Sequence, residues 1–120
     1  MLVEDDKDVC DTLAIGLKEK GFYVAQFRDP LQALASFESG LFYLALLDVR
    51  MPSMSGFELY MKLREKDSRV NVCFLTAFEA FDEFKALFPE LATRHFMKKP
   101  TMISSLVERM NLILSEAQVQ

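Results

Sequence analysis

The sequence alternates short hydrophobic runs with longer stretches in which hydrophobic positions recur at helical spacing. The short runs cover residues 1–3, 22–27, 44–47, 70–75 and 95–97. Between and after them, the stretches 8–20, 29–40, 57–66, 79–88 and 102–114 place apolar residues three or four positions apart, which is the period of an α-helix. Short strands that alternate with amphipathic helices are typical of βαβ units. The pattern therefore predicts five strands and five helices in an α/β fold.

Glycine and proline mark the ends of several predicted helices. Gly21 follows the first helix and Gly40 the second, and Pro89 interrupts the fourth. Asp29 and Pro30 form a start signal for the second helix, because aspartate is a favoured N-cap and proline is favoured at the first helical position. These residues support the division of the chain into five units.

The central hydrophobic runs predict how the strands are arranged. The runs 44–47 and 72–75 are continuously apolar and lack the alternation of a strand with one exposed face. Strands of this kind belong to parallel sheets that helices cover on both sides. We therefore expect a three-layer α/β/α sandwich around a five-stranded parallel sheet.

Length and composition indicate a single domain spanning residues 1–120. Of these residues, 51% are hydrophobic and 27% are charged, which is the balance of an ordinary globular domain. The net charge of −4 argues against direct binding to nucleic acid. The longest apolar run, residues 41–47, is too short to cross a membrane, and the first residues lack the features of a signal peptide. We expect a cytoplasmic protein in which Cys10 and Cys73 are buried free thiols.

Polar residues that could bind a ligand or take part in a reaction follow four of the five predicted strands. They are Glu4, Asp5 and Asp6 after the first run, Asp48 after the third, Thr76 after the fourth, and Lys98 and Lys99 after the fifth. In parallel α/β sheets, ligands bind outside the carboxyl ends of the strands. We therefore expect three or more carboxylates, one hydroxyl and one or two ammonium groups to converge at one edge of the sheet.

This set of groups indicates phosphoryl chemistry that depends on magnesium. Clustered carboxylates repel one another, and a hard divalent cation such as Mg²⁺ relieves that repulsion. With the cation in place, one carboxylate can attack phosphorus while a lysine and a hydroxyl hold the phosphoryl oxygens. The competing interpretation is that each acid is a solvated cap at a strand end, which explains any one residue but not the whole set.

Four segments resemble the motifs of two-component response-regulator receiver domains in order and spacing. They are LVEDD at 2–6, LLDVRMP at 46–52, LTA at 75–77 and KP at 99–100. The resemblance covers essentially the whole chain. It implies a flavodoxin-like sheet with strand order 2-1-3-4-5, a domain that is not an enzyme in the ordinary sense, and catalysis only of its own phosphoryl transfer and dephosphorylation.

The resemblance also implies a role for each site residue. Asp48 is the implied phosphoacceptor, and Thr76 and Lys99 are the residues implied to contact the phosphoryl group. The implied Mg²⁺ ligands are Asp5 directly, Glu4 through water, and the Arg50 carbonyl. Thr76 and Phe96 are the implied switch pair. Glu4 stands where aspartate is more frequent, and the Gly-Ala pair common before the switch aromatic is replaced by residues 92–95. Phe96 has no hydroxyl, so its readout of the signal differs from that of a tyrosine.

By the same resemblance, the phosphoryl donor is a sensor histidine kinase or a phosphotransfer protein. The output would be a change in partner binding through the face formed by the fourth helix, fifth strand and fifth helix, with a homodimer or an effector as partner. The phenylalanine-rich stretch 77–88, which includes Phe81 and Phe84, has an apolar face wider than a surface helix needs. Two interpretations are open: the side chains form a thick core under the helix, or one or two of them are exposed on that face as a partner site. Arg50 and Phe78 are expected to flank the phosphoryl group and slow its hydrolysis.

Two other functions are compatible with an acidic, magnesium-binding site. One is a Mg²⁺-dependent aspartyl-phosphate phosphatase resembling the haloacid dehalogenase group, which places its nucleophile after the first strand and normally carries a cap insertion. The other is a pseudo-receiver that binds partners without phosphorylation. The position of Asp48 after the third strand disfavours the first, and the complete set of Asp5, Asp48, Thr76 and Lys99 disfavours the second.

Overall fold

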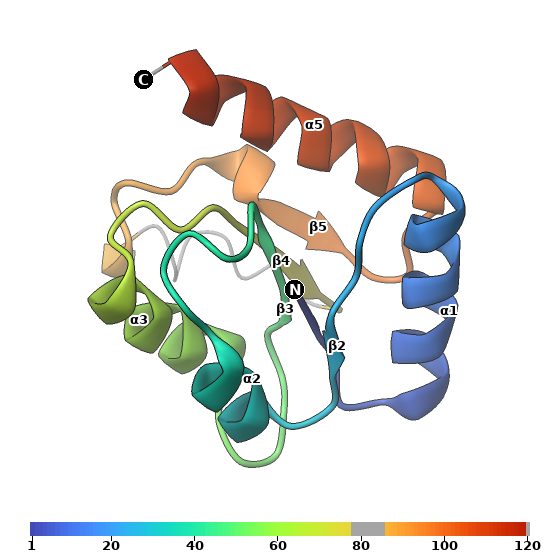
Figure 1. Ribbon diagram of the computed structural model, residues 1–120, viewed down its shortest axis with the longest axis horizontal. Helices are drawn as coiled ribbons and strands as arrows, with labels where there is room; N and C mark the ends of the chain where they lie inside the picture. Colours follow the sequence, from blue (N-terminus) through green and yellow to red (C-terminus); the bar gives the residue numbers. More distant parts are fainter. Residues whose placement is uncertain (78–85, 120) are drawn as a thin grey trace.

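The computed structural model, which describes residues 1–77 and 86–119, contains a five-stranded sheet with helices on both faces (Figure 1). The strand order is β2-β1-β3-β4-β5, and every neighbouring pair is parallel. The three-layer α/β/α sandwich and the strand order expected from the sequence are both confirmed.

The first two strands are shorter than the hydrophobic runs that contain them, and the other three each extend one residue beyond the end of their run. The strands are β1 (Leu2–Val3), β2 (Gln26–Phe27), β3 (Ala45–Asp48), β4 (Val72–Thr76) and β5 (Phe96–Lys98). β2 pairs only with the two residues of β1, so its hydrogen-bonded part is limited to two residues. His95 was expected to begin the fifth strand but instead ends a 3₁₀ helix, η1 (Thr93–His95), where its Nδ1 accepts a hydrogen bond from the Ala92 N–H at 2.9 Å.

The helices begin where side chains cap them. The structure describes α1 (Lys7–Glu19), α2 (Pro30–Ser36), α3 (Gly56–Lys66) and α5 (Ile103–Val119). Asp6, Asp29 and Ser55 cap the first three by accepting from backbone N–H groups of the first turn. α2 ends at Ser36 rather than at Gly40, because Phe37 adopts an extended backbone and is buried in the core.

Part of the expected fourth helix lies outside the described residues. Phe78, Phe81 and Phe84 lie outside the described residues, so the aromatic face of this helix and the shielding role of Phe78 stay predictions. Within the described residues that follow, Leu87 is 67% exposed and Phe88 is buried.

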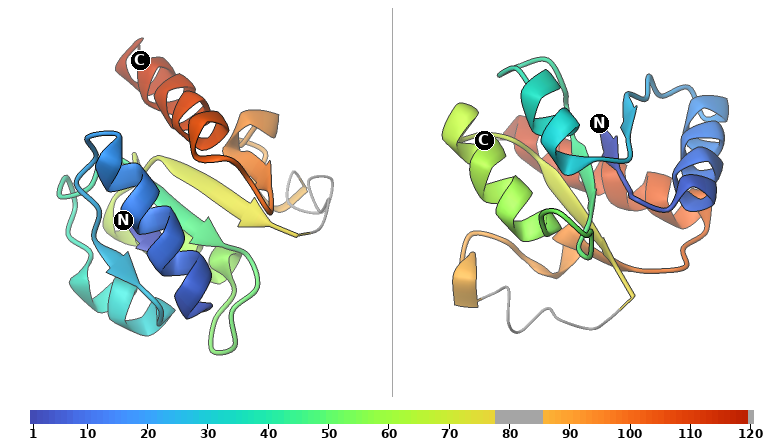
Figure 2. Two further views of the ribbon diagram at one scale, coloured as in Figure 1. Left: turned by 90° about the vertical axis from the view of Figure 1, so that its right-hand side faces the viewer. Right: turned by 90° about the horizontal axis from the view of Figure 1, so that it is seen from below.

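The sheet separates two hydrophobic layers (Figure 1 and Figure 2). On one face, α2 and α3 cover Val3, Leu47 and Phe74, and on the other face α1 and α5 cover Leu2 and Leu46. Neighbouring strand residues point to opposite faces, so each apolar run supplies both layers. Cys10 and Cys73 are free and buried in the second layer, as expected. Among the described helices, none is long and apolar enough to cross a membrane.

The pairing register decides which polar residues become neighbours. Val3 of β1 pairs with Leu47 of β3, so the next residue of each strand, Glu4 and Asp48, lie side by side at the carboxyl end of the sheet. Thr76, the last residue of β4, pairs with Lys98 of β5. The carboxyl ends of the inner strands therefore bring the polar groups to one edge.

Candidate functional site: an acidic cleft at the carboxyl end of the sheet

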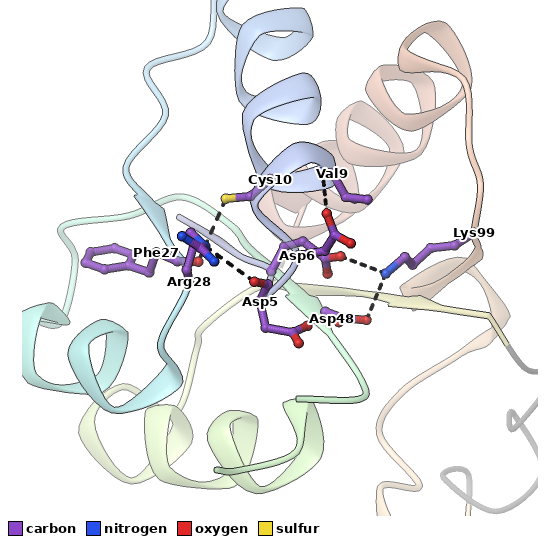
Figure 3. A network of polar contacts seen from close by, with 9 residues as sticks. Asp5, Asp6, Val9, Cys10, Phe27, Arg28, Asp48 and Lys99 are labelled. Atoms are coloured by element: carbon purple, nitrogen blue, oxygen red, sulfur yellow. Dashed lines mark hydrogen bonds and ion pairs between the residues drawn. The ribbon is translucent and has the colours of Figure 1, made fainter. Parts of the chain in front are cut away.

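A cleft of about 260 Å³ opens where the strands β1, β3 and β4 end. Its lining contains Glu4, Asp5, Asp6, Val9, Asp48, Arg50, Thr76, Ala77 and Lys99. Figure 3 shows the carboxylates of Asp5 and Asp48 and the ammonium group of Lys99 close together below the first turn of α1. The structure thus brings together the acids, the hydroxyl and one of the two lysines that the sequence placed at this edge; Lys98 is not among the lining residues.

Lys99 joins two of the acids. Its Nζ donates to Glu4 Oε1 at 2.9 Å and to Asp48 Oδ1 at 3.3 Å. The Glu4 side chain is 1% exposed and that of Asp48 6%, and a buried carboxylate requires such a partner to remain charged. The backbone N–H of Lys99 donates to the Thr76 carbonyl at 2.7 Å, which fixes the start of the lysine side chain at the end of β4.

Burial and crowding shift the proton affinities of the two central aspartates. Burial, followed by the neighbouring Glu4 carboxylate, raises the pKa of Asp48 to about 6, against the opposing charge of Lys99. Burial and the proximity of Asp48 also raise the pKa of Asp5. Burial alone would lower the pKa of Lys99, but the hydrogen bond to Glu4 and the charge of Asp48 raise it. The cluster therefore holds more negative charge than Lys99 neutralises.

The cleft has the donor set of a site for a hard cation. Glu4, Asp5 and Asp48 each offer a carboxylate oxygen, and these oxygens lie within 4.8 Å of one another. The second oxygen of Glu4 is buried and accepts no hydrogen bond from the described residues. Three carboxylate oxygens so close together suit Mg²⁺. A cation bound among them would compensate the negative charge that Lys99 does not neutralise.

The remaining predicted residues take different positions. Asp6 lines the cleft but is exposed, and its Oδ1 accepts from the Val9 N–H at 3.1 Å as the N-cap of α1. Arg50 is exposed at the rim and Thr76 is buried. Phe96 is not among the lining residues; its ring stacks on Phe74 with centroids 5.3 Å apart.

Two residues that contact the backbone of the cleft were not predicted from the sequence. The end of β2 was expected to contribute no functional group, yet Arg28 Nε donates to the Asp5 carbonyl at 3.4 Å (Figure 3). Gly56 was given no role from the sequence, whereas the structure places it against the backbone of Asp48. Arg28 directly follows an apolar run, as the other site residues do, and this was the available signal; the contact of Gly56 has none in the sequence.

The family model described as the response regulator receiver domain matches residues 1–111. The transcriptional regulatory protein PrrA of Mycobacterium tuberculosis is 33% identical over 114 residues, which are 95% of this chain and 48% of PrrA. The transcriptional regulatory protein PcoR of Escherichia coli is 31% identical over 121 residues, covering the whole chain and 53% of PcoR. The chain thus spans about half the length of these curated relatives.

Solved structures lead to the same family. The non-phosphorylated receiver domain of HemR from Leptospira biflexa matches with a TM-score of 0.83 and 28% identity, over 95% of this chain and 91% of that one. Together with the strand order and the match over residues 1–111, this likeness covers the whole sheet and the cleft at its carboxyl end. The chain therefore belongs to the response regulator receiver domain family, the phosphoacceptor modules of two-component signalling.

Proposed function

We propose that the Asp48 carboxylate accepts a phosphoryl group from the phosphohistidine of a sensor histidine kinase or phosphotransfer protein. The observation that supports this most directly is the position of Asp48 at the end of a central strand, beside two further carboxylates and 3.3 Å from Lys99 Nζ. Of the three acids in the cluster, Asp48 is the one that belongs to a strand, so its backbone is held by the sheet.

In the proposed reaction, an Asp48 oxygen attacks phosphorus and an acyl phosphate bond forms. The phosphorus–nitrogen bond of the donor breaks, its electron pair stays on the imidazole nitrogen, and the histidine leaves with a proton from solvent. Mg²⁺ would be held by Glu4, Asp5, Asp48 and the Arg50 carbonyl. When bound, it would neutralise the negative charge on the phosphoryl oxygens. Lys99 and Thr76 would hold the transferred oxygens, and Lys99 would exchange its contact with Asp48 for one with the phosphoryl group.

Self-dephosphorylation belongs to the same proposal. Water would attack the phosphorus of the acyl phosphate and release inorganic phosphate, with the Asp48 carboxylate as the leaving group. Arg50 at the rim would hinder that water, as would Phe78, which lies outside the described residues. Arg50→Ala should therefore shorten the lifetime of the phosphorylated form, and an unchanged decay rate would contradict a shielding role.

The proposed output is a change in binding to a homodimer partner or an effector. The face formed by the fourth helix, β5 and α5 would form the contact, with Thr76 drawn toward the phosphoryl group and Phe96 following. The stack of Phe96 on Phe74 links β5 to the core in the described state. We extend the proposal to a single receiver domain over residues 1–120 with a cytoplasmic location.

Intact mass after treatment with acetyl phosphate and Mg²⁺ tests the phosphoacceptor. One added phosphoryl group is expected on the wild type and on Asp6→Asn, which keeps the N-cap of α1. None is expected on Asp48→Asn. An adduct of equal yield on Asp48→Asn would overturn the assignment, and a complete absence of adduct on the wild type would favour the pseudo-receiver.

Titration with Mg²⁺ tests the metal ligands separately from the chemistry. Asp5→Asn removes one carboxylate from the cluster and should weaken Mg²⁺ binding by about tenfold or more, whereas Asp6→Asn should bind like the wild type. Calorimetry provides the affinity without any phosphodonor. Equal weakening by the two substitutions would show that Asp5 is not the ligand.

A further inference from the structure

Gly56, the first residue of α3, lies directly against the main chain of the proposed phosphoacceptor. A Cβ atom placed on Gly56 would stand 2.4 Å from the Asp48 carbonyl oxygen, 3.1 Å from its carbonyl carbon and 3.2 Å from Val49 Cα. Cβ atoms essentially never approach another heavy atom closer than 3.0 Å. The neighbouring atoms are backbone, so they cannot move aside by rotation of a side chain.

The glycine is required by this contact and not by its backbone conformation. Among the described residues, only Gly21 and Gly40 have positive φ, so alanine at residue 56 meets no backbone strain. Alanine is also a better helix former than glycine. Any loss caused by alanine at this position must therefore come from the atoms that the methyl group meets.

The same contact ties α3 to the strand that ends in Asp48. The Gly56 N–H donates to the Val49 carbonyl at 2.9 Å, and Ser55 caps the helix by accepting from the Glu58 N–H at 3.1 Å. The residue that follows β3 and the first residue of α3 are thus hydrogen-bonded to each other. A methyl group here must displace either the helix or the Asp48 backbone by several tenths of an ångström.

We propose that Gly56 is a positioning residue for phosphoryl transfer. Because it has no side chain, α3 can pack directly against the Asp48 backbone and hold it where the Asp48 carboxylate contacts Lys99. This inference rests on the proposed role of Asp48. Reactive groups displaced by about 1 Å can lose about a hundredfold in rate. A displacement of several tenths of an ångström in Gly56→Ala is therefore expected to slow phosphorylation by about tenfold or more.

Gly16 offers a matched control within the same chain. It also lies in a helix at a close contact, but a Cβ there would meet Ile103 Cδ1 and Cγ1, each at 2.6 Å. These atoms belong to the side chain of Ile103 on α5 and not to the backbone of the cleft, so any adjustment falls on the contact between α1 and α5. Gly16→Ala therefore adds the same methyl group without pressing on the Asp48 backbone.

The test compares initial phosphorylation rates of the wild type, Gly56→Ala and Gly16→Ala with acetyl phosphate and Mg²⁺. The rate at saturating donor should fall about tenfold or more in Gly56→Ala, with the half-saturating donor concentration changed by less than about threefold. Gly16→Ala should remain within about twofold of the wild type. A wild-type rate in folded Gly56→Ala would overturn the inference.

Two further variants separate positioning from loss of stability. Ser55→Ala removes the cap of the same helix end and costs about 1 kcal/mol without adding an atom; it should lower the melting temperature while its rate stays near that of the wild type. An equal rate loss in Ser55→Ala would overturn the inference. If Gly56→Ala unfolds in buffer, all variants are compared in trimethylamine N-oxide, which favours compact states, and failure to fold there also counts against a positioning role.

Asp48→Asn is included so that the two proposals fail separately. A phosphoryl adduct on Asp48→Asn would contradict the proposed function, whatever Gly56 does. A wild-type rate in Gly56→Ala, combined with no adduct on Asp48→Asn, would contradict the positioning role alone.

Discussion

The two ends of the sheet bury opposite kinds of side chain. At the carboxyl end, Glu4, Asp48 and Lys99 bring charges into a cleft of about 260 Å³. At the amino end, a groove of about 370 Å³ is lined almost entirely by apolar residues, among them Leu17, Phe22 and Leu44. One end thus gives up stability to concentrate charge, and the other supplies stability by excluding water from hydrocarbon.

The largest effect is expected from removing a buried side chain at the apolar end. Leu17 is 1% exposed and packs in the layer between the sheet and α1 and α5. Leu17→Ala should lower the free energy of unfolding by about 2–4 kcal/mol because it leaves a cavity. Urea denaturation provides this value. A loss smaller than that of Lys99→Met would contradict the proposal that the apolar end contributes more to stability than the charged end.

Removing the cation at the charged end should cost somewhat less. Lys99→Met keeps much of the aliphatic length but leaves the Glu4 carboxylate buried without its partner. We expect a loss of about 2–3 kcal/mol, because breaking a buried pair is more costly than its net value. Thermal unfolding with and without Mg²⁺ checks the cause, since bound cation should restore part of the loss.

Neutralising the phosphoacceptor should have the opposite sign. Burial raises the pKa of Asp48 from its ordinary 3.8 to about 6, so the folded state binds this proton more tightly than the unfolded chain does. The carboxylate therefore destabilises the fold above about pH 6, and this penalty fades as the pH falls toward 4. Asp48→Asn should raise the free energy of unfolding by about 1–2 kcal/mol at pH 7.

The pH dependence of that gain is the sharper measurement. At about pH 4.5, Asp48 is already protonated in the folded wild type, so the advantage of Asp48→Asn should shrink by more than half. Denaturation of both proteins at the two pH values tests this. A gain that is the same at both would mean that charge repulsion is not what Asp48 contributes.

The smallest effect is expected at the rim of the apolar groove. Tyr23 and Tyr43 line the groove but are 93% and 86% exposed. Tyr23→Ser and Tyr43→Ser should each change the free energy of unfolding by less than about 0.5 kcal/mol. Denaturation midpoints measure this. A larger loss in either variant would show that the ring covers apolar surface at this end in solution.

The site could be predicted from the sequence because parallel strands place their carboxyl ends together. Asp48 ends an unbroken apolar run and Glu4 follows another, so their shared edge follows from the order of the runs alone. The limits of the elements were less predictable. His95 belongs to an apolar run by composition, but its ring accepts a local hydrogen bond that keeps it in a 3₁₀ turn.

The sequence by itself determined the layers, the parallel sheet and the set of polar groups at its carboxyl edge, because hydrophobic periodicity and strand-end positions are local properties of the chain. The family resemblance supplied the strand order and the individual roles. Only the tertiary structure decided that Lys99 contacts both Glu4 and Asp48, that Asp6 caps a helix, and that Gly56 touches the Asp48 backbone. These contacts join residues through packing and register, and distances between segments far apart in the chain are not encoded in the spacing of residue types.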